Sequence, residues 1–288
     1  MITPIFFLVF LFGWFVLGLI LGSFINVLVS RFPLFISGGG ISVFSGRSHC
    51  DNCKKKLVWY ELVPLVSFLV QKKKCRSCGG LIPHRYAYIE LAVGCVFLLL
   101  GGTIMSGSGI NGVTSFNVIT SPLFFLHAMA LIVGVFALTA IFFIDREHYY
   151  IPDFLIIIFF ISGAIEAVIR ISFFWQESFF NLGLSILGVF LFFFAIWFFS
   201  QGRAMGFGDV KFAPFFPIFF GALPGVFAIF FAFWIGAIVS VFLLASRKKG
   251  MRDRVPFGPF LVAGGFTVLF IPRASEIIFS FFNWFVYF

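Results

Sequence analysis

The chain has 288 residues, of which 61% are hydrophobic and only 11% are charged, and its mean hydropathy is +1.11. Soluble domains are about half apolar and about one quarter charged, so this composition excludes a soluble protein and predicts an all-α polytopic membrane protein. The formal net charge is +9. In a membrane protein, basic residues gather on the cytoplasmic side, which explains this excess without a nucleic-acid partner.

The first apolar run covers residues 5–29, enough to cross a bilayer at about 20 residues per crossing. It has no basic start and no small-residue cleavage site, so we expect residues 1–29 to be a retained first span, not a removed signal peptide. Gly18, Gly22 and Asn26 follow one another at every fourth residue and predict a face for close helix packing, with direct ligand contact as the alternative.

Residues 30–85 form the only extended polar region and hold ten of the twenty basic residues. Two cysteine pairs, Cys50/Cys53 and Cys75/Cys78, lie here with 21 residues between them. A CxxC turn sets two thiolates on one side of a tight knuckle, and two knuckles complete a tetrahedron around Zn²⁺. We expect a cytoplasmic zinc-binding domain in which four thiolates leave the metal no open position. Disulfides or redox motifs are the alternative, which a reducing compartment disfavours.

The remaining residues, 86–288, read as further spans. Single crossings are predicted at residues 86–105, 121–144, 154–174, 180–200 and 258–275. The stretch 212–246 should cross twice, because the loops on both sides of it are assigned to the cytoplasm. Its first crossing is then short or partly re-entrant. This arrangement has about eight crossings and places eighteen of the twenty basic residues on the cytoplasmic side, as the positive-inside rule expects.

Two aspartates lie where apolar segments meet that cytoplasmic side. Asp145 ends one apolar run, and Asp209 stands in the loop Gly206-Phe-Gly208-Asp209-Val-Lys211 before another. An ionisable group at the mouth of a span is a candidate functional residue by default, and the two glycines allow the backbone a tight turn. The alternative is an ordinary cytoplasmic turn with Lys211 reaching the membrane surface.

If these spans are neighbours, the two carboxyl groups meet at similar depth. Two carboxylates a few ångströms apart in a low dielectric cannot both ionise cheaply, so one keeps its proton. The pair is then an acid and a base at one pH, which is the chemistry of an aspartic peptidase. Glu147 and Asp153 compete with Asp145, but Pro152-Asp153 is more typical of the start of the next helix, with Asp153 near its N-terminus. A solvated Asp145 paired with Arg146 is the remaining alternative.

Together these motifs resemble the type IV prepilin leader peptidases, bifunctional membrane enzymes also called prepilin peptidase/N-methyltransferases. The resemblance covers nearly the whole chain. It rests on Gly22-Ser-Phe-Ile-Asn26-Val with Arg31-Phe-Pro33, the paired cysteine knuckles with Trp59, Pro64 and Arg85-Tyr86-Ala-Tyr-Ile-Glu90, Ile144-Asp145 with Pro152-Asp153, the glycine loop at 206–211, and Pro256-Phe-Gly258-Pro259. Lys73 departs from the pattern, because it stands where bifunctional members have a glycine before the third cysteine.

The resemblance implies Asp145 and Asp209 as the catalytic pair and a zinc ion on the four cysteines. It implies that the substrates are prepilins and type II secretion pseudopilins, whose basic leader is cut on the cytoplasmic side of the bacterial inner membrane. The cut follows a glycine and precedes the precursor's apolar helix. The new N-terminal residue is then methylated from S-adenosylmethionine. The lipid bilayer is the other expected partner.

Two other functions compete with a peptidase. A zinc-stabilised membrane scaffold or assembly factor would need the cysteines but not the aspartates. A transporter would need ionisable groups near the middle of the bilayer, whereas here they gather at one side.

Overall fold

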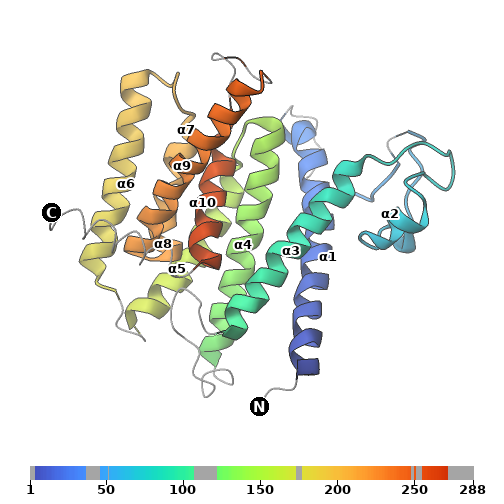
Figure 1. Cartoon of the computed structure of the whole chain (residues 1–288), viewed down its shortest axis with the longest axis horizontal. Coiled ribbons are helices and arrows are strands. Elements are labelled where there is room, and N and C mark those ends of the chain that lie inside the picture. The colour runs from blue at the N-terminus through green and yellow to red at the C-terminus, as the bar shows by residue number, and fades with distance from the viewer. Residues whose placement is uncertain are drawn as a thin grey trace. The chain divides into compact units, whose positions relative to one another are not determined.

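The computed structural model describes residues 4–36, 46–50, 52–106, 122–172, 177–247, 250 and 255–271. Within these ranges the chain forms helices and two isolated β-bridges (Figure 1), so the predicted all-α class is confirmed there. The elements in chain order are α1 (Pro4–Ile36), η1 (Trp59–Glu61), α2 (Val66–Val70), α3 (His84–Ser106), α4 (Pro122–His148), α5 (Asp153–Ser172), α6 (Phe179–Ser200), α7 (Phe207–Phe212), α8 (Phe215–Phe220), α9 (Ala222–Ala245) and α10 (Gly258–Phe270).

Six of the described helices are long and apolar enough to cross a membrane, namely α1, α3, α4, α5, α6 and α9. Helix α10 is apolar but has only 13 residues. Two helices of six residues each, α7 and α8, precede α9, and neither is long enough to cross alone. The chain is therefore a multi-pass membrane protein, while the total of about eight crossings stays a prediction.

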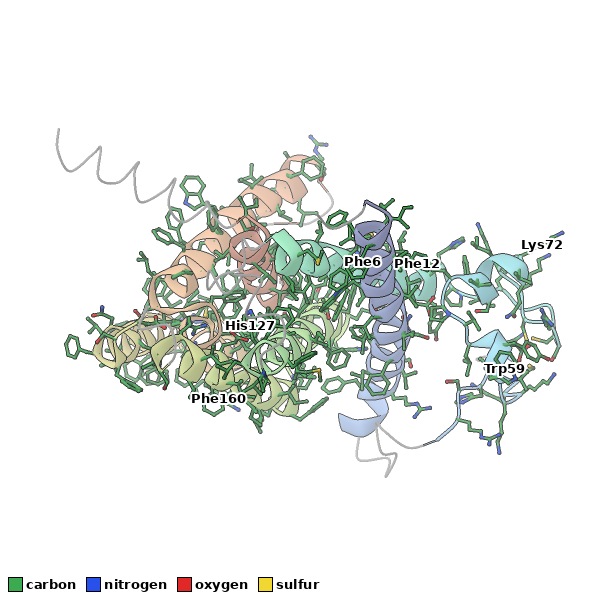
Figure 2. All side chains as sticks on the ribbon, turned by 90° about the horizontal axis from the view of Figure 1, so that it is seen from below. Phe6, Phe12, Trp59, Lys72, His127 and Phe160 are labelled. Atoms are coloured by element: carbon green, nitrogen blue, oxygen red, sulfur yellow. The ribbon has the colours of Figure 1, made fainter. Side chains whose placement is uncertain are left out.

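The outer surfaces of the long helices are apolar, as contact with lipid requires. Figure 2 shows Phe6 and Phe12 projecting from α1 and Phe160 from α5, and these side chains are 58%, 65% and 40% exposed. Water would disfavour so many exposed rings, and a bilayer would not.

Contacts divide the chain into two compact units, Met1–Gly102 and Thr103–Phe288. The first unit joins α1 and most of α3 to the cysteine-bearing region. The predicted division into residues 1–29, 30–85 and 86–288 follows membrane topology instead and stays a prediction.

The predicted packing face of α1 is confirmed in the first unit. A Cβ added at Gly18 would lie 2.7 Å from Cβ of Phe97, and one at Gly22 would lie 2.8 Å from Cα of Glu90. Both glycines therefore let α1 and α3 approach closely. Asn26, on the same face, is buried and its amide donates to the carbonyl of Tyr86 at 3.0 Å.

The second unit is a helical bundle in which α10 packs between α4 and α9, and α8 packs between α5 and α9 (Figure 1). Phenylalanine rings fill its centre. Phe159 of α5 contacts Phe212, Phe216 and Phe219 at centroid distances of 5.5, 5.6 and 5.0 Å. Gly163 of α5 makes room for the last of these, because its Cβ would lie 3.1 Å from Cα of Phe219.

The stretch 212–246, predicted to cross twice with a short first crossing, is interrupted at Gly221. Helix α8 ends at Phe220 and α9 begins at Ala222, with Gly221 between them at φ 102°, a conformation that favours glycine. A Cβ added at Gly225 would lie 2.4 Å from Cα of Pro217, so the two helices touch backbone to backbone.

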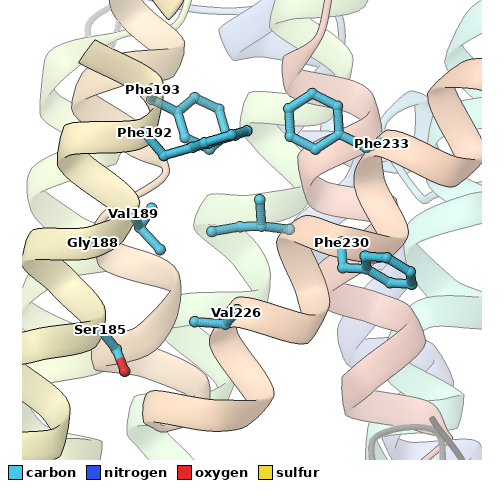
Figure 3. A pocket seen from close by; sticks show the side chains of 9 residues that line it. Ser185, Gly188, Val189, Phe192, Phe193, Val226, Phe230 and Phe233 are labelled. Atoms are coloured by element: carbon cyan, nitrogen blue, oxygen red, sulfur yellow. The ribbon is translucent and has the colours of Figure 1, made fainter. Parts of the chain in front are cut away.

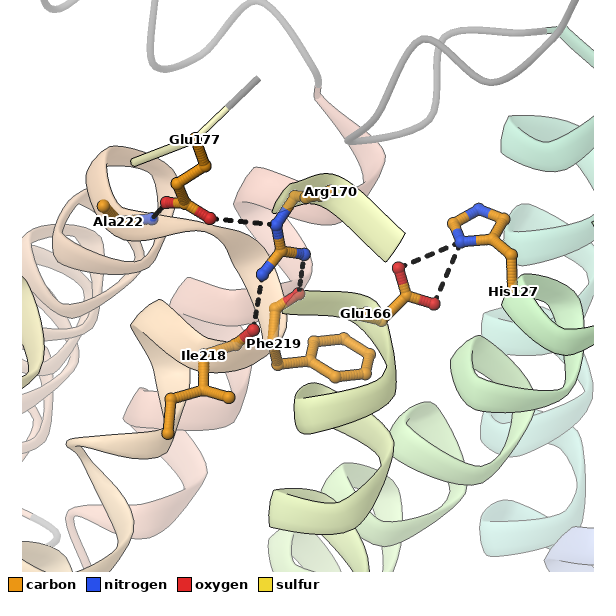
Figure 4. A network of polar contacts seen from close by, with 7 residues as sticks. All are labelled: His127, Glu166, Arg170, Glu177, Ile218, Phe219 and Ala222. Atoms are coloured by element: carbon orange, nitrogen blue, oxygen red, sulfur yellow. Dashed lines mark hydrogen bonds and ion pairs between the residues drawn. The ribbon is translucent and has the colours of Figure 1, made fainter. Parts of the chain in front are cut away.

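A buried polar network holds this break in place (Figure 4), and the sequence did not predict it. Arg170, only 3% exposed, donates to the carbonyl oxygens of Ile218 and Phe219 at the end of α8. Its Nε also pairs with Glu177 at 3.2 Å, and Glu177 accepts the amide of Ala222. The guanidinium thus neutralises the C-terminal carbonyls of a short helix, which have no partners within it.

Substitution of Arg170 with Met should destabilise the protein by about 3 kcal/mol, because it leaves Glu177 and two carbonyls buried without their partner. The melting temperature in detergent would fall, and the double variant with Glu177→Gln should lose less than the single one. Arg203→Met is the matched control, since Arg203 is exposed and donates only to the nearby Ser200 carbonyl. Equal melting temperatures for Arg170→Met and Arg203→Met would contradict the assigned role.

Candidate active site and metal centre

Asp145 lies in the last turn of α4 and is 5% exposed. Its carboxylate accepts the backbone amide of Gly258, the first residue of α10. A Cβ added at Gly258 would lie 2.5 Å from Oδ2 of Asp145. The absence of a side chain at Gly258 is therefore what lets the carboxylate reach that amide.

Asp209 lies in the first turn of α7 and is 7% exposed. Its backbone amide donates to the carbonyl of Gly206 at 3.2 Å, while its carboxylate accepts the amide of Gly206. Gly206 is the N-cap, so Asp209 closes the helix start as the third helical residue of a capping box does. The glycine loop therefore forms a fixed turn that presents the second carboxylate.

The structure brings the two aspartates together within the second unit. Burial raises the pKa of Asp209 from 3.8 to about 7, the negative charge of Asp145 adds to this rise, and the amide of Gly206 opposes it. Oδ1 of Asp209 is buried without a hydrogen-bond partner. A protonated carboxyl beside an ionised one can give one proton and take another, which is what amide hydrolysis without a metal needs.

Ile151 is a site residue that the sequence analysis did not single out. It is 7% exposed, and its side chain contacts the backbone positions of both glycines, with a Cβ at Gly208 lying 3.5 Å from its Cβ and one at Gly258 lying 3.3 Å from its Cδ1. Ile151 thus packs against both glycines that neighbour the two carboxyl groups. Its place in the sequence, between Asp145 and Pro152, is the feature that could have identified it as a neighbour of the site.

Lys211 lies outside the carboxyl pair. Its Nζ pairs with Asp153 at 3.1 Å, and both side chains are well exposed. Asp153 was predicted near the N-terminus of the next helix and is the first residue of α5, and its carboxylate accepts from Nζ of Lys211. The pair joins the start of α5 to α7, so Lys211 supports the loop without contacting the aspartates.

The four cysteines of the first unit converge. Their sulfur atoms all lie within 4.8 Å of one another, and Sγ of Cys50 and Sγ of Cys78 are 3.9 Å apart. Four sulfurs about 2.3 Å from a tetrahedral zinc ion would lie about 3.8 Å apart, so the cluster fits such an ion. No disulfide joins them, and this set of thiols is what a structural metal site requires.

The two knuckles have the same backbone form. The residue after each second cysteine is left-handed, Lys54 at φ 57° and Gly79 at φ 67°. The backbone amides of Cys78 and Ser77 lower the pKa of Cys75 to about 6, which favours its thiolate. The amide of Lys55 acts likewise on Cys53, but desolvation and the neighbouring sulfurs outweigh it and raise that pKa to about 11. Four crowded thiolates thus repel one another unless a cation sits among them.

Lys73 is also left-handed, at φ 63°. Its amide donates to the carbonyl of Phe68 at 3.0 Å, and its carbonyl accepts the amide of Ile82 at 2.8 Å. Such a conformation favours glycine and costs another residue about 1 kcal/mol. The turn at position 73 is therefore one that glycine adopts readily, and lysine adopts it without losing its hydrogen bonds.

Comparison with known proteins gives two family models in chain order. The bacterial peptidase A24 N-terminal domain matches residues 16–103, and the type IV leader peptidase family matches residues 132–241. The first match contains all four cysteines of the cluster, and the second contains Asp145 and Asp209. No solved structure is significantly similar to the chain.

Curated relatives match most of the chain. The prepilin leader peptidase/N-methyltransferase of Bacillus subtilis is 30% identical over 250 residues, covering 87% of this chain and 90% of the relative. The protein of the same name from Stutzerimonas stutzeri is 25% identical over 272 residues, with 88% of each chain covered. A type 4 prepilin-like proteins leader peptide-processing enzyme of Escherichia coli is 27% identical, covering 88% of this chain and 91% of the relative. This chain therefore belongs to the prepilin leader peptidase family of membrane enzymes.

Proposed function

We propose that the protein removes the leader peptide from type IV prepilins, and from pseudopilins of similar form, with Asp145 and Asp209 as the catalytic pair. The observation that carries this proposal is the burial of both carboxyl groups in one site at the ends of apolar helices. The charge distribution of the sequence supports a cytoplasmic face of the bacterial inner membrane as the place of cleavage.

The mechanism follows from the different environments of the two carboxyl groups. Ionised Asp145, held by the amide of Gly258, takes a proton from a water molecule as the water oxygen attacks the scissile carbonyl carbon. Protonated Asp209 gives its proton to the carbonyl oxygen, and a gem-diol forms. The carbon–nitrogen bond then breaks while Asp145 returns its proton to the leaving nitrogen. A hydroxyl of the gem-diol gives its proton to Asp209, which is then protonated again.

This assignment predicts the pH dependence of cleavage. The pKa of Asp209 is raised to about 7, so the group is protonated below that value and ionised above it. The rate should fall about tenfold per pH unit above about 7. The folded state should lose stability between pH 3.8, the usual pKa of the carboxyl, and about 7, because there the unfolded carboxyl is already ionised while the folded one stays protonated. A pH profile of kcat/KM in detergent measures this. A rate that rises through pH 7 would contradict protonated Asp209 as the acid.

The cluster of four cysteines is proposed to hold a structural zinc ion. Zinc would join the two knuckles and neutralise the thiolates, and four ligands leave it no position for substrate. Purified protein should carry about one zinc ion per chain, and Cys75→Ser should remove it. Cys95→Ser is the matched control, because Cys95 is a free cysteine outside the cluster. Wild-type protein without metal and with oxidised thiols would contradict the proposal.

Methylation of the new N-terminal amine from S-adenosylmethionine is the second proposed activity. It is supported by the names of the relatives and by the match of residues 16–103 to the N-terminal domain model.

Mass spectrometry of a co-expressed prepilin tests both activities. The wild-type protein should remove the leader and add one methyl mass to the new N-terminus. Cleavage without that mass would leave a peptidase alone. An intact leader would favour the non-catalytic scaffold, in which the cysteines matter and the aspartates do not.

A further inference from the structure

An apolar groove of about 360 Å³ lies between α6 and α9 in the second unit (Figure 3). The hydroxyl of Ser185 is the only polar side-chain group among the residues that line it. Both helices belong to the six that are long and apolar enough to cross a membrane, so a bilayer rather than water would surround the groove.

Each wall of the groove is one face of a helix. On α6 it includes Ser185 and Gly188, and on α9 Val226, Ile229 and Phe233, which follow the spacing of three and four residues that helices use to pack. The small residues on α6 leave the space open, since a Cβ added at Gly188 would meet nothing within 4 Å. Small residues at such a spacing are typical of sites where a membrane helix approaches another.

Aromatic contacts join one end of the groove to the start of α10. Phe193 and Phe233 lie at one end of it, and their rings contact Phe257 at centroid distances of 6.1 and 5.0 Å. Phe257 precedes Gly258, whose amide binds Asp145. Three aromatic rings thus connect the end of the groove with the site where the proposed cleavage takes place.

We propose that this groove receives the apolar transmembrane helix of the precursor and so presents the peptide bond at that helix's cytoplasmic end to Asp145 and Asp209. The inference rests on the proposed function. A helix suits these walls because it satisfies its own backbone groups, and apolar side chains lining a groove offer none. The ring contacts that run from the groove through Phe257 toward Gly258 connect its occupant with the carboxyl pair, a link that serves a substrate helix and gives a lipid chain nothing.

Two glycines of α6 provide a matched test. Gly188 lines the groove and Gly183 does not, and in each case an added Cβ meets nothing within 4 Å. Gly188→Trp should lower kcat/KM for a full-length prepilin in proteoliposomes by about tenfold or more, because the indole occupies the place of the substrate helix. Gly183→Trp should cleave like wild type. Equal activity of the two variants would overturn the groove proposal while leaving the peptidase intact, whereas failure of wild type to cleave would overturn the proposed function itself.

Photo-crosslinking covers the case in which Gly188→Trp does not fold. Benzoylphenylalanine at position 188 of the Asp209→Asn protein should capture the prepilin through its apolar segment, and the same probe at position 183 should not. Capture of lipid alone at position 188, or equal capture of prepilin at both positions, would overturn the proposal.

Discussion

Asparagine in place of either Asp145 or Asp209 should lower the rate of leader cleavage by about a thousandfold or more, because an amide of the same size can neither take nor give the proton that hydrolysis needs. Both side chains are nearly fully buried, so there is little room for a water molecule to take over the proton transfer of the lost carboxyl group. The measurement is the fraction of co-expressed prepilin that retains its leader, determined by mass spectrometry.

Asp153→Asn is the control for these variants. Its carboxylate is exposed and paired with Lys211, and such a surface pair contributes about 0–1 kcal/mol, so cleavage should persist. The comparison also separates Asp145 from Asp153, one of its two competitors in the sequence. Full cleavage by either the Asp145→Asn or the Asp209→Asn variant would exclude the aspartic mechanism and favour the non-catalytic scaffold.

A methyl group at position 258 should be almost as damaging as loss of a carboxyl group. Gly258→Ala would place Cβ 2.5 Å from Oδ2 of Asp145, a separation that forces the carboxylate away from the amide it accepts. Displacement of a catalytic group by about 1 Å costs about a hundredfold in rate, and we expect a loss of that order in kcat.

Gly183→Ala controls for the general effect of a new methyl group in an apolar helix, since that position is open. The melting temperatures of both variants should be compared, so that a folding defect is not mistaken for a catalytic one. A stable Gly258→Ala protein with wild-type kcat would show that the amide of Gly258 does not position Asp145.

The long helices could be predicted because membrane spans are specified by local composition. Runs of apolar residues predicted the long helices outside the stretch 212–246 to within a few residues at most ends, although α1 continues to Ile36 because a helix need not stop where its hydropathy does. The glycine face of α1 was visible for the same reason, as a spacing along one helix.

Contacts between distant segments could not be predicted in this way. Arg170 donates to backbone carbonyls 48 and 49 residues away in the sequence. The residues next to Arg170 in the sequence do not indicate these partners. The buried pair His127 and Glu166, with Nδ1 2.9 Å from the carboxylate, was likewise missed. A hydropathy scale counts each such charged residue as unfavourable within a membrane span. In the folded bundle the same residue binds a particular polar group on another helix.

The candidate site could be predicted in part, less fully than the long helices and better than the contacts between distant segments. The two aspartates were chosen from their position at the ends of apolar runs, which is a local property, and the structure brings them together. Gly258 and Ile151 enter only through the packing of α10 against α4, so their contacts with the site needed the structure. Their catalytic and supporting roles remain for the variants above to test.

The division of contacts after Gly102 has a consequence for how such a protein can evolve. Every described residue of the carboxyl pair and its surroundings follows the division, and all four clustered cysteines precede it. Among the described residues, α1 and most of α3 precede it, an even number of long apolar helices, so deletion of this segment together with the end of α3 would leave the orientation of the later spans unchanged. A gene could thus lose or gain that segment in one event without inverting the rest of the protein in the bilayer, and the two proposed activities could be inherited separately.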